Sequence, residues 1–513
     1  MAKYLAGVDV GTTGARCVIF DFKGQIISSG YREYGAIYLK PGWVDQDLAE
    51  MVPLTMDACK EAITKSRINP SEIASIGFST QRSVTVPVAK DGRCIRPMIS
   101  WQDARTGAEV TDIAKLIDPA RFYEISGMPL GTTWTITKIL WMKKNEPELF
   151  KKTYKFVQLQ DAVLQAFGAE DFYTDIPDLA FSGVWDVTNL EWSKELFDLI
   201  GIIPDMFGKP SLPGTKVAEV SASIVAKTGF TLGTPICIGA GDQNCGVVGM
   251  GSVKSGMATV SLGTGGLIAL SLDRRIPGFG GLLVTNHAVP GMWEMEGLSN
   301  AAASSYRWFR DVIGTNEVQL EKINGRNAYE YLNDLAKQAK PGSKGLLYLP
   351  YLGTAATPRW NSNARAAFIG MSFAHGRPEM VRSIMEGVVL EIRDMIEGWL
   401  RAGVELTTMR LGGGATKSPL WNQIQADIYG RPVETLKTSE ATVLGAAILG
   451  GVGSGVFGTI QEGVDAMVQV ADHIEPNMVN HEVYEEMYVA FVKAYEGLAD
   501  SGAFDQLAKI QTV

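Results

Sequence analysis

The sequence is poor in cysteine and histidine, the residues that most often form covalent cross-links or bind structural zinc. Its 513 residues include five cysteines and four histidines, and no CxxC pair occurs. The histidines follow none of the spacings of a zinc site. Scattered cysteines in odd number are typical of reduced thiols in a protein core. The sequence therefore argues against a structural zinc site and against a disulfide framework.

Long apolar runs and an excess of positive charge are also missing. No uninterrupted apolar stretch is long enough to span a bilayer, and the opening "MAKYLAGVDVG" lacks the apolar segment and cleavage site of a secretory signal. The net charge of -9 disfavours a nucleic acid or an anionic membrane as partner. We therefore expect a cytoplasmic protein that acts on a small molecule and binds neither nucleic acid nor membrane.

Glycine, in contrast, is abundant, with 56 residues that indicate many tight turns or loops close to a ligand. The chain is too long for one ordinary core, so we expect two or more domains. Hydrophobic residues make up 46% and charged residues 20%, as in globular proteins.

The first forty residues predict three short antiparallel strands, Tyr4–Val10, Ala15–Phe22 and Gln25–Tyr31, separated by turns. The first turn is Gly-Thr-Thr-Gly, and Asp9 stands just before it. Backbone N–H groups, two hydroxyls and a carboxylate at one strand end suit a phosphate and its metal ion. A plain glycine-rich hairpin tip is the alternative interpretation of this stretch.

The same pattern returns about 250 residues later. Met257–Leu272 again predicts a strand, a Gly-Thr-Gly-Gly turn and a strand. The period is too long for a solenoid. Two copies therefore suggest two similar domains that face each other, each with a Gly-Thr turn at a shared cleft.

Other segments mix helix and strand, so the fold class is α/β. Thr234–Gly251 predicts a strand, a Gly-flanked turn at Asp242 and a helix of small residues. "TWTITKILWMKKNEPELF" predicts one helix with Pro147 near its end, and an apolar stripe from Met380 to Ile396 predicts another. A triple glycine follows the predicted strand at "MRLGGG". From about Phe457 we expect loops and polar helices without recognisable chemistry.

Five of these motifs together resemble the FGGY carbohydrate kinases, which include glycerol kinase, xylulokinase, gluconokinase and the autoinducer-2 kinases. They are "DVGTTGARCVIFD", "GAGDQNCG", "SLGTGG", "LGGGATKSPLWNQIQADIYGRPV" and "AAFIGMSFAHGRPEMVRSIME". The resemblance implies two actin-like (RNase H-like) domains around a central cleft. Residues 1–252 would carry the sugar side and the catalytic Asp, and residues 253–513 the ATP side. We expect the hinge near Gly249–Gly256.

The resemblance also implies roles for the motif residues. Asp242 would be the general base, although an Asp at this place could instead cap the next helix. Asp9 would hold Mg²⁺. The residues expected to bind ATP are Gly11, Thr12, Thr13, Arg16, Gly263, Thr264, Gly265, Gly412, Gly413, Gly414 and Asn422. For Arg16 a solvated surface position is the competing interpretation, and for Asn422 a solvent-facing one.

The sugar side is expected after two predicted strands, where polar groups and one aromatic face could hold hydroxyls and carbons. The residues expected to bind the substrate are Gln81, Arg82, Ser83, Trp101, Asp103, Arg105, Asp242 and Gln243. A structural Trp beside a surface Asp–Arg pair is the alternative.

The identity of the substrate rests on departures from the family pattern. Glycerol kinases place Arg-Glu where this chain has Arg82-Ser83, and their "GERTP" is here "GTAATP". The "WQDAR" stretch resembles that of xylulokinases, although their usual Met-His is absent. We therefore expect a ketopentose such as xylulose first, with glycerol, a tetritol or tetrulose, or an autoinducer-2-like dione as alternatives. An actin-fold ATPase or a non-catalytic sensor is the alternative of another class, and a monomer or a homodimer is compatible with the sequence.

Overall fold

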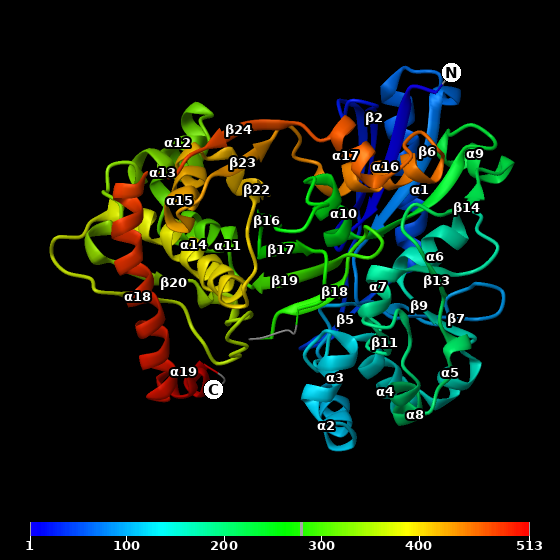
Figure 1. The fold of residues 1–513 in the computed structure, drawn as a ribbon, viewed down its shortest axis with the longest axis horizontal. Coiled ribbons are helices and arrows are strands. Elements are labelled where there is room, and N and C mark those ends of the chain that lie inside the picture. The colour runs from blue at the N-terminus through cyan, green and yellow to red at the C-terminus, as the bar shows by residue number, and fades with distance from the viewer. Residues whose placement is uncertain (1, 277–280, 512–513) are drawn as a thin grey trace.

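The computed structural model describes residues 2–276 and 281–511, which form two large mixed sheets (Figure 1). The first sheet contains β1 (Tyr4–Val10), β2 (Gly14–Asp21), β3 (Ile26–Glu33), β6 (Ile73–Thr80), β14 (Lys216–Glu219) and β15 (Pro235–Gly241) in the order β14-β15-β6-β1-β2-β3. The second contains β16 (Met257–Leu262), β17 (Gly266–Leu272), β18 (Leu283–Asn286), β19 (Trp293–Ser299), β22 (Thr408–Gly412), β23 (Val433–Leu436) and β24 (Val470–Ile474) in the order β18-β19-β17-β16-β22-β23-β24.

The two sheets share one topology. In the first, β1, β2 and β3 are successive antiparallel neighbours, while β6 and β15 continue the sheet in parallel beside β1. In the second, β16, β17 and β19 are antiparallel neighbours, and β22 and β23 follow in parallel beside β16. The expectation of an internal repeat, and of a first meander of three strands, is confirmed.

Helices cover both faces of the first sheet because its strands alternate apolar side chains between the faces. On one face Ala6 and Val8 of β1 pack with α1 (Leu48–Ser66), which begins after Asp47, whose carboxylate caps the helix at Ala49 N. On the other face Leu5 packs with α10 (Asp242–Gly249) and α16 (Ala441–Gly453). Asp9 of β1 is oriented toward this second face by the same alternation.

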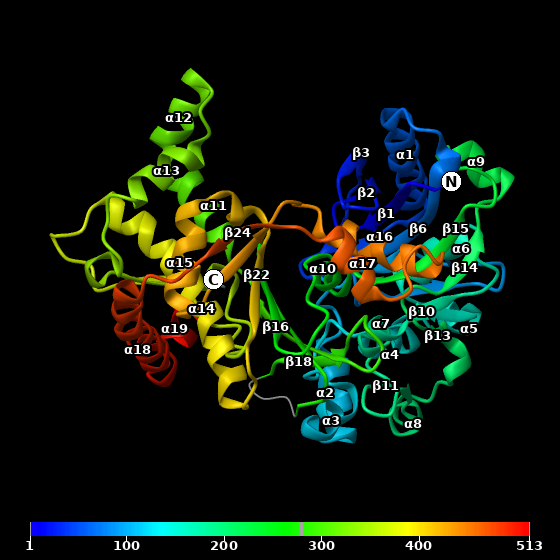
Figure 2. The ribbon, with the colours of Figure 1, turned by 45° about the horizontal axis from the view of Figure 1, so that its top comes forward.

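The late helix α16 returns to the first half of the molecule. Figure 2 shows α16 and α17 (Ile460–Met467) beside β1–β3, although the expected division after residue 252 would assign them to the second half. The chain therefore passes between the halves three times, once at residues 468–469 between α17 and β24, and twice next to α10 and α16, at residues 250–256 and at residues 437–440. At this place α10 and α16 touch backbone to backbone, because a Cβ on Gly249 would lie 1.8 Å from the Ala441 carbonyl oxygen.

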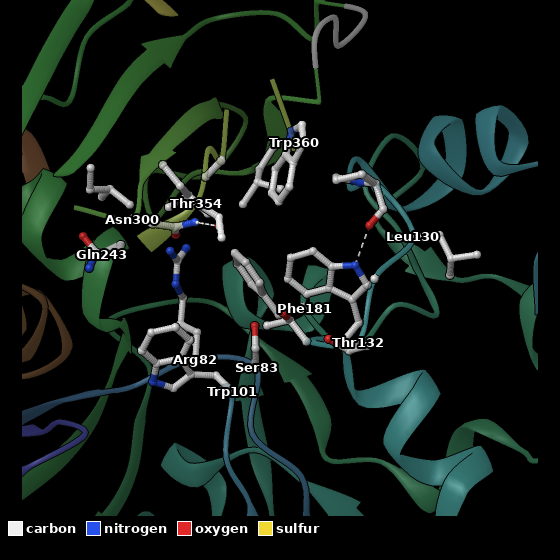
Figure 3. A pocket seen from close by; sticks show the side chains of 18 of the residues that line it. Arg82, Ser83, Trp101, Leu130, Thr132, Phe181, Gln243, Asn300, Thr354 and Trp360 are labelled. Atoms are coloured by element: carbon white, nitrogen blue, oxygen red, sulfur yellow. Dashed lines mark hydrogen bonds between the residues drawn. The ribbon is translucent and has the colours of Figure 1, made fainter. Parts of the chain in front are cut away.

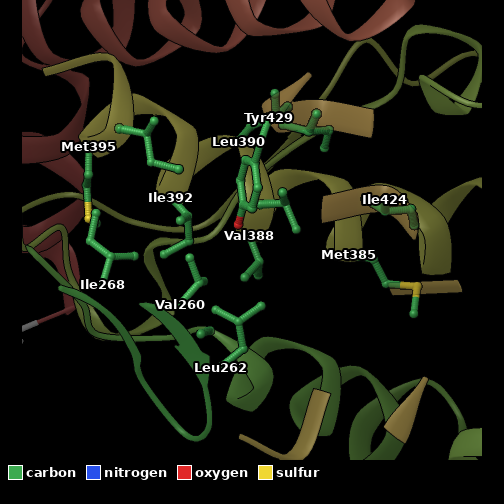
Figure 4. Close-up of a cluster of buried hydrophobic side chains, with 14 of the residues drawn as sticks. Val260, Leu262, Ile268, Met385, Val388, Leu390, Ile392, Met395, Ile424 and Tyr429 are labelled. Carbon is green, nitrogen blue, oxygen red and sulfur yellow. The ribbon is translucent and has the colours of Figure 1, made fainter. Parts of the chain in front are cut away.

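The core of the second half forms around α14 (Arg377–Arg401). Its predicted apolar stripe is confirmed, since Ile384, Val388 and Ile392 are fully buried. Figure 4 shows Val388 and Ile392 beside Val260 and Leu262 of the sheet. The packing of this long helix fixes the strand that ends at the second Gly-Thr turn.

Two expectations about local structure were wrong. The helix predicted through Pro147 is two helices, α4 (Thr135–Asn145) and α5 (Pro147–Lys152). Proline disfavours helical backbone at the residue before it and suits the first turn of a new helix, so the break falls at Glu146.

The C-terminal segment also contains more than loops and polar helices. β24 adds an edge strand to the second sheet, and α18 (Met478–Asp500) buries Tyr484, Phe491 and Tyr495 against the core. α19 (Ala503–Gln511) follows. Within the described residues no helix combines the length and the apolar character needed to cross a membrane.

Candidate active site

A cavity of about 640 Å³ lies between the two halves, and both contribute to its wall (Figure 3). Its lining residues are Arg82, Ser83, Trp101, Pro129, Leu130, Gly131, Thr132, Thr133, Trp134, Phe181, Asp242 and Gln243 from the first half, and Leu267, Leu283, Leu298, Asn300, Thr354, Ala355, Ala356, Trp360 and Ser362 from the second. Five of the eight residues expected on the substrate side are therefore brought together here.

Asp242 reaches this cavity because β15 ends at Gly241 and α10 begins immediately afterwards. The N-cap is Gly241, so Asp242 is the first helical residue and the alternative interpretation as a helix cap does not hold. One oxygen of Asp242, Oδ1, accepts from Gln243 N at 2.8 Å and lies 3.6 Å from Arg82 Nε. Burial raises the pKa of the carboxyl, and the positive charge of Arg82 opposes the rise. The side chain is 29% exposed, so it can meet a ligand.

Arg82 follows β6 and is fixed on several sides. It donates to both carboxylate oxygens of Glu296 at 2.6 and 2.7 Å, and to Asn244 Oδ1 at 3.2 Å. Its guanidinium lies over the ring of Phe181, with the carbon Cζ 4.2 Å from the centroid. Glu296 lies in β19, 214 positions away, so no local pattern could have indicated this pair.

Ser83 has left-handed backbone, with φ of 59°. Its carbonyl accepts from Nζ of Lys138, a fully buried residue of α4. Burial lowers the pKa of Lys138 to about 7, and Asp103 opposes the fall. The sequence predicted the helix that carries Lys138, but nothing in that segment indicated a link to Ser83.

Trp101 lines the cavity and connects it to the first Gly-Thr turn. Trp101 Nε1 donates to Thr12 Oγ1 at 3.0 Å, and the Thr12 hydroxyl donates to Gln81 Oε1 at 3.1 Å. Gln81 is buried behind the wall and donates to Gln46 at 2.9 Å. The structure thus places Gln81 between the turn and the cavity, rather than on the cavity wall.

Asp103 and Arg105 do not reach the cavity. Both side chains are fully buried and pair with each other at 2.8 Å, so they form no surface ion pair either. Asp103 also accepts from Val44 N at 2.6 Å, and Arg105 bonds Asp45 and lies over the Trp43 ring. Direct contact of this pair with a substrate is therefore not supported, and the pair braces the loop that carries Trp101.

A smaller cavity of about 290 Å³ lies beside the first turn. It is lined by Asp9, Gly11, Thr12, Thr13, Gly14, Arg16, Tyr31, Ser439, Glu440, Ala441, Thr442 and Val443. Asp9 Oδ1 accepts from Ser79 Oγ at 2.8 Å. Burial and the nearby Asp242 raise the pKa of Asp9 to about 7. Arg16 pairs with Glu440 and lies over the Tyr31 ring.

The residues around Asp9 fit Mg²⁺, which takes oxygen ligands and only one or two carboxylates besides water and phosphate. A carboxylate and threonine hydroxyls supply such oxygens. In the part of the chain that the structure describes, no group of three or more His, Cys, Asp or Glu residues could hold a metal ion. A site built on one carboxylate would suit a cation that arrives with a phosphate ligand.

The expected ATP residues of the second half lie at two neighbouring strand ends. Gly263 N donates to Gly265 O at 2.9 Å, as Gly11 N donates to Gly14 O at 3.0 Å in the first turn. Gly412 ends β22 opposite Ser261 of β16. These turns therefore present backbone from adjacent strands at one edge of the sheet.

The glycine run supplies close backbone approach. Gly413 has φ of 80°, and a Cβ there would lie 2.5 Å from the Leu262 carbonyl oxygen. Around Gly414 no described atom lies within 4 Å of an added Cβ, so a flat ring can approach. Asn422 is buried behind the loop and donates to Thr416 O, and its Oδ1 lacks a partner among the described residues. A solvent-facing Asn422 is thereby excluded.

The same mixed sheet occurs in both halves, and a carboxylate and two Gly-Thr turns lie between the two copies. This arrangement is typical of two-domain phosphotransferases of the actin-like class. The chain belongs to the FGGY family of carbohydrate kinases: the family's N-terminal domain matches residues 4–249 and its C-terminal domain residues 258–454. The protein is therefore a carbohydrate kinase, an enzyme family that uses ATP.

Relatives differ in their named substrates. A xylulose kinase of Staphylococcus epidermidis is 29% identical over 96% of this chain and 97% of its own. A glycerol kinase of Thermoanaerobacter is also 29% identical, over 97% and 98%. The solved xylulose kinase of Lactobacillus acidophilus shares the fold, with a TM-score of 0.88 at 24% identity over 97% and 98% of the two chains. Family membership thus leaves the acceptor open.

Proposed function

We propose that the protein transfers the γ-phosphoryl group of ATP to a hydroxyl of an open-chain ketopentose such as xylulose, with Asp242 as general base. The observation that carries the proposal is the position of Asp242, on the wall of a cavity shared by both halves and next to a fixed arginine. A carboxylate there can accept the proton of the attacking hydroxyl.

The other residues act by position and charge. Asp9 would hold Mg²⁺, which neutralises charge on the phosphate oxygens when bound. Thr12, through its backbone N–H because its hydroxyl is bonded to Gln81 and Trp101, would donate to a phosphate oxygen, as would Thr13 and Thr264. The glycines at 412–414 would lie against the adenine. Trp101 would offer an apolar face to the acceptor, while Arg82, Ser83 and Gln243 would hold its hydroxyls.

The size and chemistry of the cavity support a longer acceptor than glycerol. Ser83 is short and uncharged, where the resemblance gives glycerol kinases a glutamate. Glu296 does not take over that role, because it is fully buried and both of its oxygens accept from Arg82. A cavity of about 640 Å³ leaves room for five carbons. Spare room discriminates weakly, whereas a missing hydrogen-bond partner discriminates strongly, so glycerol should be a poor acceptor.

The test is ADP release over a panel of glycerol, erythritol, erythrulose, xylulose, ribulose, gluconate and an autoinducer-2-like dione. We expect the highest kcat/KM with xylulose. A highest value with glycerol would contradict the argument from Ser83. Ser83→Glu provides the matched comparison, since it should raise the activity on glycerol relative to xylulose. If no acceptor releases ADP above background, the proposed substrate class is wrong.

A further inference from the structure

The residue that sets the orientation of Arg82 comes from the other half of the molecule. Arg82 follows β6 in the first sheet, whereas Glu296 lies in β19 of the second. Both side chains are removed from solvent, with 8% and 0% exposure. A bidentate pair of this kind is strong and geometrically specific, and the loss of one partner leaves a buried charge unpaired.

The hydrogen bonds leave one edge of the guanidinium unused. Of its five N–H donors, one on Nη1 goes to Glu296 Oε1, the other on Nη1 goes to Asn244, and one on Nη2 goes to Glu296 Oε2. The two remaining donors, on Nε and Nη2, lie side by side on the same edge of the planar group. Nε lies 3.6 Å from Asp242 Oδ1, so this edge adjoins the base.

The stem of Arg82 is held as firmly as its head. A Cβ on Gly241 would lie 2.3 Å from both Cγ and Cδ of Arg82, so the arginine passes directly over the residue that precedes the base. Phe181 closes one face of the guanidinium. Gly241 thus restricts the stem of Arg82 and Phe181 restricts one face of its guanidinium. The orientation of the guanidinium within its plane then depends mainly on Glu296.

We propose that Glu296 is a positioning residue: it holds Arg82 so that the free Nε and Nη2 edge meets the acceptor hydroxyls beside Asp242. A strand of the half that carries the second phosphate turn thereby orients the acceptor site of the first half. The inference rests on the proposed function, because it assumes that Arg82 binds the acceptor.

The test is Glu296→Gln in the full-length enzyme, with KM and kcat measured for the best acceptor of the panel and KM for ATP measured separately. We expect KM for the acceptor to rise about 10- to 100-fold, as for the loss of a charged hydrogen-bond partner. KM for ATP should stay within about twofold, because the change acts through Arg82 only. A purely structural role would alter both constants or neither.

Glu294→Gln is the matched control. Glu294 lies on the same strand and is equally buried, but its carboxylate accepts from Asn244 rather than from Arg82. Burial and the neighbouring Glu296 raise its pKa well above the usual range, so the neutral amide is a close substitute. An unchanged acceptor KM in Glu296→Gln, or an equal rise in Glu294→Gln, would overturn the inference.

A paired substitution covers the case in which Glu296→Gln does not fold. Arg82→Met with Glu296→Met removes both charges together, which buried pairs often tolerate. Because Glu296 acts through Arg82, the double variant should match Arg82→Met alone in acceptor KM, and a further loss would contradict the inference. Failure of the proposed function would show differently, as wild-type enzyme that releases no ADP with any acceptor.

Discussion

The two Gly-Thr turns join equivalent strand pairs but differ in length and in surroundings: Gly11 N donates to Gly14 O in the first, and Gly263 N donates to Gly265 O in the second. The first turn follows Asp9, and its Thr12 hydroxyl is bound by Gln81 and Trp101. The second follows Ser261, and its exposed Thr264 is fixed through the main chain, where the carbonyl accepts from Ser304 N at 3.2 Å. The first turn is thus joined by a side-chain hydrogen bond to Trp101 of the large cavity, whereas the second is held by its backbone.

The difference shows how a repeated scaffold separates two tasks. The strand pairs are shared, and each turn is closed by a hydrogen bond from the N–H of its first glycine, so backbone that could bind phosphate is present in both halves. Charge and side-chain hydrogen bonds are concentrated in the first half, next to Asp242. We therefore expect side-chain substitutions at the first turn to affect catalysis and acceptor binding far more than those at the second turn.

The largest effect is expected for Asp242→Asn, since removal of a general base lowers kcat by about 10²- to 10⁴-fold. ADP release measures kcat, and calorimetry should show that ATP still binds. Asp178→Asn is the control, because Asp178 is a fully buried carboxyl whose pKa is raised well above the usual range by burial, Asp175 and Asp161. Near-normal turnover of Asp242→Asn would show that Asp242 is not the general base.

A second comparison substitutes, in separate variants, the residue that precedes each turn. Asp9→Asn should lower kcat by about 10²-fold, because the Mg²⁺ that Asp9 would hold would supply several kcal/mol of charge stabilisation when bound. Ser261→Ala, at the equivalent place in the second half, should change kcat by less than about twofold. The measurement is turnover at saturating acceptor over a range of Mg²⁺ concentrations. Equal losses in the two variants would contradict the division of tasks.

A third comparison uses the threonines of the turns. Thr12→Val removes the hydroxyl between Gln81 and Trp101, so KM for the acceptor should rise about tenfold, as for one or two lost hydrogen bonds. Thr264→Val should leave KM for the acceptor unchanged and raise KM for ATP instead. Steady-state kinetics with each substrate varied in turn measures both constants. The reverse pattern would place the acceptor at the second turn.

The last prediction concerns Lys138 and stability rather than turnover. Its pKa is lowered by burial to about 7, so between pH 7 and its usual 10.5 the unfolded chain holds a proton that the folded chain lacks. The free energy of unfolding therefore gains from this group as pH rises through that window. In Lys138→Met the free energy of unfolding should rise less steeply with pH than in the wild type, by on the order of 1 kcal/mol per pH unit.

Urea unfolding at several pH values in this window measures the difference. Lys143→Met on the same helix is the control, because Lys143 is exposed and its Nζ donates to Ile200 O at the last residue of α8 (Lys194–Ile200). Its curve should run parallel to that of the wild type. If the pH dependence of unfolding of Lys138→Met also parallels that of the wild type, burial does not lower the pKa of Lys138 and the prediction is wrong.

The repeat and the proposed base could both be predicted from the sequence because each depends on a short contiguous pattern. A strand that runs into Gly-Thr, or into Gly-Asp, is visible without any alignment. Glu296 and Lys138 were not found because their partners Arg82 and Ser83 are distant along the chain. Asp103 and Arg105 have side chains that suit a sugar, but their burial against Trp43 and Asp45 is a tertiary property. The edge strand β24 is exposed and carries little apolar pattern.

The glycine contact between α10 and α16 has a mechanical consequence. Two of the three passages of the chain between the halves adjoin this contact: one leaves the first half after Gly249, and the other enters it at Ala441. Two backbones in direct contact have no side chains to slide over one another, and a methyl group on Gly249 or on Gly445 would force them apart. If the halves rotate about this contact, the pair of Arg82 and Glu296, which joins the two halves, would shift with the rotation.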